Sequence, residues 1–165
     1  MASPNIPLVL PARKAKGLVV HFGCQVAPFY KMGAVAPEGA PVQFVSGTGD
    51  EVELVTAGSA PSGTVIGLLA QQVYDASALG ELRNYEFHNN TKARIDDTVG
   101  VVTGQGWLLT NNYVGAATIG ASLYPAASGK LSITQTGTDP AIAIAETAGT
   151  DGATLIRVRV DFRII

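Results

Sequence analysis

The sequence predicts an all-β protein: a small β-barrel or sandwich with an extended N-terminal arm and at most one short helix. Short apolar runs are broken throughout by Gly, Pro and Asn, and 19 of the 165 residues are glycine. The final segment alternates strictly between apolar and polar side chains, which is the signature of a half-buried strand. Short strands separated by frequent turn residues are typical of sandwiches and barrels.

The first 16 residues predict an arm that precedes a single barrel domain at residues 17–165. Pro4, Pro7 and Pro11 each fix φ and lack a backbone donor, so a helix or a central strand is disfavoured there. An apolar arm without a helix of its own is expected to lie on a partner or on a neighbouring subunit. The side chains expected to bind that partner are Ile6, Leu8, Leu10, Arg13, Lys14 and Lys16.

The sequence predicts a series of short strands in the middle of the chain. The expected strands cover residues 18–22, 41–45, 51–56, 64–69, 99–103, 106–110, 118–124, 130–134 and 141–145. Gly104-Gln105 predicts a hairpin between two of these runs. One short helix is expected from Asp75, which can cap it, to about Leu82.

The strongest prediction is the last strand. Its apolar face would hold Ile156, Val158, Val160, Phe162 and Ile164, and its polar face Arg157, Arg159, Asp161 and Arg163. A register shift of one residue would bury the charged face, so the register is strongly fixed. The arginines repel one another unless acids lie opposite, either Glu51 and Glu53 on a neighbouring strand or an acidic partner surface. Arg157, Arg159 and Arg163 are therefore candidates for an interface with a partner.

Composition narrows the classes of function. Only 15% of the residues are charged, against about a quarter in an average domain, which suggests that neighbours cover much of the surface. The net charge of −2 gives no case for a nucleic-acid binder. No apolar run reaches about 18 residues, so no membrane helix is expected. The N-terminus lacks a signal-peptide pattern, and the single cysteine, Cys24, fits a reducing cytoplasm.

The motifs that could carry catalysis are incomplete, so a protein that is not an enzyme is expected. His21 and Cys24 form H-x-x-C without a second cysteine. The sequence GSAPSG at residues 58–63 does not fit the G-x-S-x-G nucleophile motif. The acids near Asp50 lack a calcium-loop spacing. No catalytic residue, metal or cofactor is predicted.

Several segments occur in a characteristic order. GAPVQFV (39–45) comes first, GASLYPAASGKL (120–131) follows the pattern G-x-x-L-Y-x-x-x-x-G-x-L, and AIAIA (141–145) and VRV (158–160) come after it. This order resembles the phage capsid cement (head decoration) proteins. The resemblance covers residues 39–162 and is strongest from residue 117. Residues 71–97 depart from the family pattern, because they are richer in Tyr, Asn and charge.

The resemblance implies a β-barrel or β-tulip subunit that forms a homotrimer and binds the major capsid protein. It also implies that the arm side chains named above bind the capsid, and that Arg157, Arg159 and Arg163 lie at a trimer or shell interface. Such a protein is made in the host cytoplasm and holds neighbouring capsomers together on the capsid surface of the virion. Two alternatives stay open. One is another virion part, such as a tail, baseplate or fibre module. The other is a carbohydrate-binding β-sandwich that uses Trp107, Tyr113 and Asn111-Asn112.

Overall fold

The computed structural model describes residues 18–20, 23–58, 65–74 and 92–162. Within these ranges the protein is all-β, as predicted, with one 3-10 turn at Ala127–Gly129. The predicted arm (1–16) and the predicted helix (75–82) lie outside the described residues. The strands are β1 (Leu18–Val20), β2 (Cys24–Met32), β3 (Pro41–Phe44), β4 (Glu51–Leu54), β5 (Val65–Leu69), β6 (Gln72–Tyr74), β7 (Lys92–Arg94), β8 (Thr98–Thr110), β9 (Tyr113–Val114), β10 (Ala116–Ala117), β11 (Ser122–Pro125), β12 (Leu131–Ser132), β13 (Ala143–Ala145), β14 (Gly149–Thr150) and β15 (Ile156–Phe162). No helix in the described ranges is long and apolar enough to cross a membrane.

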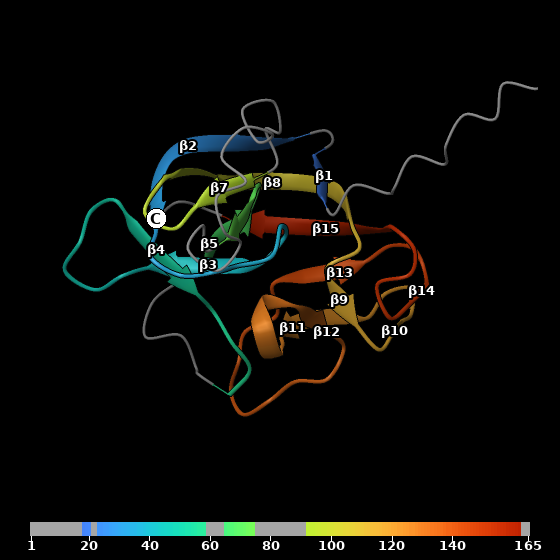
Figure 1. Ribbon diagram of the computed structural model, residues 1–165. Coiled ribbons are helices and arrows are strands. Elements are labelled where there is room, and N and C mark those ends of the chain that lie inside the picture. The colour runs from blue at the N-terminus through green and yellow to red at the C-terminus, as the bar shows by residue number, and fades with distance from the viewer. Residues whose placement is uncertain (1–17, 21–22, 59–64, 75–91, 163–165) are drawn as a thin grey trace, which may run out of the picture.

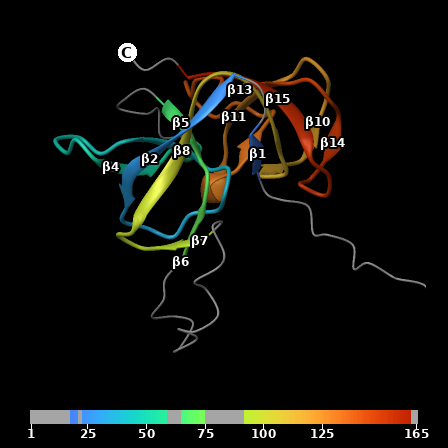
Figure 2. The same cartoon turned by 90° about the horizontal axis from the view of Figure 1, so that it is seen from above.

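The strands of the N-terminal half pair in a closed order, which we call the first ring. β4 pairs with β3, β3 with β5, and β5 with the first half of β8, all antiparallel. β8 then pairs with β2, and β2 lies parallel to β4, so the order returns to its start. Figure 2 shows β2 and β8 side by side. The interior of this ring, the first core, includes Met32, Val42, Val52, Leu69, Val99 and Val101.

A second closed order, the second ring, uses the other half of β8. Here β8 pairs with β15, β15 with β13, β13 with β11, and β11 with β12. β12 lies parallel to β9, which follows β8 in the chain (Figure 1). The second core includes Leu108, Tyr113, Leu123, Leu131, Ile156 and Val158. β8 therefore belongs to both rings.

The hairpin predicted at Gly104-Gln105 is wrong, because β8 runs without a break from Thr98 to Thr110. Gly104 has a φ of 88°, which glycine adopts without strain, so the strand continues through it. Gly104 pairs with Cys24 on one edge and with Phe162 on the other. With both edges occupied by distant strands, the two halves of β8 cannot fold back on each other.

Several other predicted strands are shorter than expected, two of them by three residues or more. The run at 118–124 becomes strand only at Ser122, because Thr118 accepts a backbone hydrogen bond of 3.1 Å from the Ala121 N–H and closes a turn. The run at 130–134 is strand only at Leu131–Ser132. The last strand is confirmed from Ile156 to Phe162, where buried and exposed residues alternate without exception. Its predicted end, Arg163 and Ile164, lies outside the described residues.

Candidate interaction surface

The polar face of β15 is exposed on the outside of the second ring. Arg157, Arg159 and Asp161 are exposed, whereas Ile156 and Val158 between them are fully buried. The third predicted arginine, Arg163, lies outside the described residues. β15 thus presents a charged row whose direction is fixed by the burial of its other face.

Arg157 is held in place by its own chain. Its Nε lies 2.7 Å from Glu146 Oε2, and its guanidinium lies over the Trp107 ring, 5.5 Å from the ring centroid. The Arg157 N–H donates a 2.7 Å hydrogen bond to Thr147 Oγ1, and the Arg157 carbonyl accepts one of 2.7 Å from the Glu146 N–H. Ion pairing and stacking on an indole are both typical roles of arginine.

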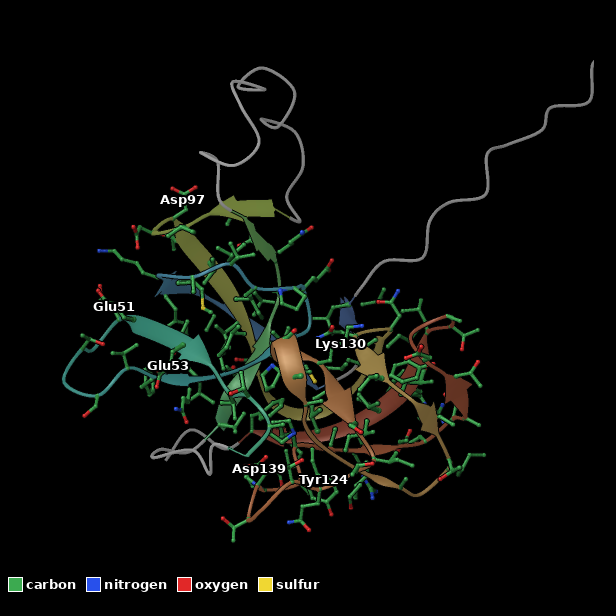
Figure 3. All side chains as sticks on the ribbon, turned by 60° about the horizontal axis from the view of Figure 1, so that its bottom comes forward. Glu51, Glu53, Asp97, Tyr124, Lys130 and Asp139 are labelled. Carbon is green, nitrogen blue, oxygen red and sulfur yellow. The ribbon has the colours of Figure 1, made fainter. Side chains whose placement is uncertain are left out.

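Glu51 and Glu53 do not lie opposite the arginines of β15. The prediction that these two acids lie on a strand next to the arginines is therefore wrong within one chain. Both acids are exposed on β4, which is separated from β15 in the sheet by β3, β5 and β8. Glu53 accepts a 2.9 Å hydrogen bond from Gln43 Nε2 on the adjacent strand. Figure 3 shows Glu51 and Glu53 on β4, away from Tyr124 on β11. Long-range pairing decides which strands are neighbours, and local sequence does not encode it.

Arg159 borders a groove of about 430 Å³ on the outer face of the second ring, which we call the β15 groove. Arg159 pairs with Trp107 on β8 and with Ile144 on β13, and Ile144 in turn pairs with Ser122 on β11. The lining includes Gln105, Ser122, Ile142, Ile144, Arg159 and Asp161. Arg159 forms no ion pair with any other residue that the structure describes. Apolar surface beside an available guanidinium is typical of protein interfaces.

The sequence identified Arg159 but missed its neighbours in the groove. Ser122 and Ile144 become neighbours of Arg159 only through the pairing of β11, β13 and β15. The sequence contains only a weak indication of Ile144. It lies within an Ala-Ile-Ala-Ile-Ala run, and the strand register decides which of these side chains face outward.

The side chains proposed for a sugar platform are mostly buried. Tyr113 is 1% exposed, and its hydroxyl lies 3.2 Å from the Thr154 carbonyl. Asn112 is 7% exposed and donates a 2.7 Å hydrogen bond from Nδ2 to the Gly129 carbonyl. Trp107 is half-buried beneath the Arg157 guanidinium. These residues hold the second ring together and do not form an exposed aromatic surface.

The remaining polar groups of the described residues have surroundings that favour structural roles. Among the described residues, no group of three or more His, Cys, Asp or Glu could hold a metal ion. Burial raises the pKa of the half-buried Cys24 thiol, which disfavours the reactive thiolate. Asp139 is buried, and its Oδ2 accepts a 2.9 Å hydrogen bond from the Gly58 N–H. That contact joins the loop after β4 to the loop before β13, which is a structural role.

The predicted arm contacts, Ile6, Leu8, Leu10, Arg13, Lys14 and Lys16, lie outside the described residues. No family model matches this chain, and no curated protein matches it. The resemblance to cement proteins therefore depends on the sequence segments alone.

Proposed function

We propose that the protein is a phage capsid cement protein that binds the outer surface of the head as a trimer and holds adjacent capsomers together. The observation that carries the proposal is the position of the resembling segments. Residues 120–131 form a turn, β11, the 3-10 turn and β12, and the next two segments fall on β13 and β15. Leu123, Gly129 and Leu131 of the G-x-x-L-Y-x-x-x-x-G-x-L pattern are buried. The pattern thus corresponds to framework positions of one ring.

Multivalent attachment explains how a small protein can stabilise a shell. Three linked copies bind much more tightly than one, because the second and third contacts form at high effective concentration. Prolines at positions 4, 7 and 11 restrict the arm in its free state, so it loses less conformational entropy on docking. Exposed polar residues of β15 supply a further surface for contact between subunits.

The first test is co-sedimentation of the purified protein with mature, undecorated capsids of the cognate phage, together with its mass by light scattering. Binding that saturates at a fixed ratio to the major capsid protein, with a trimeric mass, is the expected result. A protein that does not sediment with capsids at any concentration contradicts the proposal. Binding to tails or to glycans in parallel assays would then favour the alternatives.

A second test concerns the arm. Deletion of residues 1–16 should weaken capsid binding while the mass in solution stays that of the wild type. Two full-length variants separate the contributions, one with Arg13, Lys14 and Lys16 changed to Ala, and one with Ile6, Leu8 and Leu10 changed to Ser. Added salt should weaken capsid binding by the wild-type protein about as the charge variant does, because salt screens the same ionic contacts. It should not reproduce the loss of capsid binding caused by the apolar variant. Unchanged binding by the truncated protein would exclude a role for the arm.

A further inference from the structure

The two rings repeat the same strand arrangement. In the first, β3 pairs antiparallel with β4 and β5, and in the second, β11 pairs antiparallel with β12 and β13. Each ring also contains one parallel pair: β2 with β4 in the first, and β9, which follows β8 in the chain, with β12 in the second. The closing strand, β8 or β15, pairs antiparallel with β5 or β13. β8 closes the first ring and opens the second.

The registers of the two rings correspond where the three central strands of each ring meet. Pro41 pairs with Leu68, and Leu68 with Val102, in the first ring. In the second ring, Ser122 pairs with Ile144, and Ile144 with Arg159. The three positions Ser122, Ile144 and Arg159 are thus the counterparts of Pro41, Leu68 and Val102.

The turns correspond as well. The Gly39 N–H donates to the Leu69 carbonyl at 2.7 Å, and the Leu69 N–H to the Ala40 carbonyl at 2.8 Å. In the second ring the Gly120 N–H donates to the Ala145 carbonyl at 2.8 Å, and the Ala145 N–H to the Ala121 carbonyl at 2.9 Å. Gly39 and Gly120 have φ values of 84° and 82°. The chain therefore contains one structural unit twice.

Equivalent surfaces of the two units have different surroundings. Leu68 and Val102 are both 0% exposed and pack into the second core, so the second ring covers this face of the first. Their counterparts, Ile144 and Arg159, line the β15 groove, which no described residue fills. The groove is the surface by which a third unit would join the series.

We propose that the β15 groove binds the first ring of a second copy of this chain. This inference builds on the proposed trimer, for which it names the contact. A contact between two different surfaces, head to tail, closes into a cyclic oligomer when the rotation permits. Charge at Arg159 favours one opposing surface. Arg159 stands where the first ring has Val102, and it forms no ion pair with a described residue, so a carboxylate on the occupant would complement it. Asp161 also lines the groove, so this complementarity is local to Arg159. Glu51 and Glu53 are exposed carboxylates on β4 of the first ring, and they are not adjacent to the arginines of their own chain.

The test measures self-association of the full chain by sedimentation velocity over a range of concentrations. Arg159→Glu should weaken association by on the order of 100-fold, because it places like charges in contact. A double variant, Glu51→Lys with Glu53→Lys, should weaken association similarly, and an equimolar mixture of the two variants should associate again. Lys130→Glu changes the net charge as much as Arg159→Glu at an exposed position outside the groove, and it should associate like wild type. Circular dichroism verifies folding, and Arg159→Ala gives a milder second variant.

The outcomes separate this inference from the proposed function. The inference is overturned if the wild type stays monomeric at all concentrations, or if the Arg159→Glu protein associates like wild type. The groove would then be the solvent-exposed end surface of the second unit, as in the terminal repeats of repeat proteins. If wild type binds capsids while Arg159→Glu keeps the wild-type mass, only the inference fails. If Arg159→Glu is monomeric but the associating wild type ignores capsids, only the proposed function fails.

Discussion

Gly39 and Gly120 occupy the same turn position in the two rings, and both have the positive φ that favours glycine. The space around them differs. A Cβ on Gly120 would meet nothing within 4 Å, whereas one on Gly39 would lie 3.1 Å from Asn112 Cβ and 3.2 Å from Thr110 Oγ1. Both neighbours are buried, and the Asn112 N–H donates to Thr110 Oγ1 at 3.0 Å. Gly39 is therefore needed for its conformation and for its small size, and Gly120 for its conformation alone.

Alanine at the two positions should separate these requirements. Gly120→Ala should lower the free energy of unfolding by about 1–2 kcal/mol, the cost of a left-handed residue with a side chain. Gly39→Ala should cost about 1 kcal/mol more, because the added methyl crowds Asn112. Urea unfolding followed by circular dichroism measures both. Gly49→Ala, which has open space and no positive φ, is the control; equal losses at positions 39 and 120 would contradict this account.

At the scale of the strand, local sequence predicted β15 well and β8 poorly. The alternation of β15 is complete within seven residues, so the local order of apolar and polar residues is enough to predict its two faces. β8 contains a local turn signal at Gly104-Gln105, which would suit a hairpin. Distant strands decide the outcome, since β2 and β15 pair with opposite edges of β8 at that position. Long-range pairing also explains why Arg159 was predicted while Ile144 and Ser122 beside it were missed.

Adjacent residues of β15 provide a test of its alternation. Ile156 is 0% exposed in the second core, so Ile156→Ala should lower the free energy of unfolding by about 2–5 kcal/mol. Arg157 is exposed, and Arg157→Ala should change it by no more than about 1 kcal/mol, despite the ion pair with Glu146. Denaturant unfolding of the two variants gives the comparison. A larger loss for Arg157→Ala would mean that the polar face contributes more to stability than the core face.

At the scale of the whole molecule, the two rings form one packed unit. β8 is common to both, Leu68 and Val102 of the first ring pack into the second core, and Asp139 links a loop of each. Part of the repeat is visible in the sequence, where Gly39-Ala40 is followed by Val42 and Gly120-Ala121 by Leu123. The shared strand was not predictable, because it arises from the way the two units join.

A shared strand and a shared core predict that the rings unfold together. Leu69 is 0% exposed and belongs to the first core, so Leu69→Ala should cost about 2–5 kcal/mol. Trp107, the single tryptophan, lies in the second ring and reports on it by fluorescence. At one protein concentration, Leu69→Ala should shift the urea midpoint measured by Trp107 fluorescence as far as the midpoint measured by circular dichroism. Leu123→Ala in the second core should shift both midpoints equally as well.

The contrary result is a Trp107 midpoint that stays at the wild-type value in Leu69→Ala, together with a two-step circular dichroism curve. It would mean that each ring is stable without the other. β8 would then remain folded with the second ring after the first ring has unfolded.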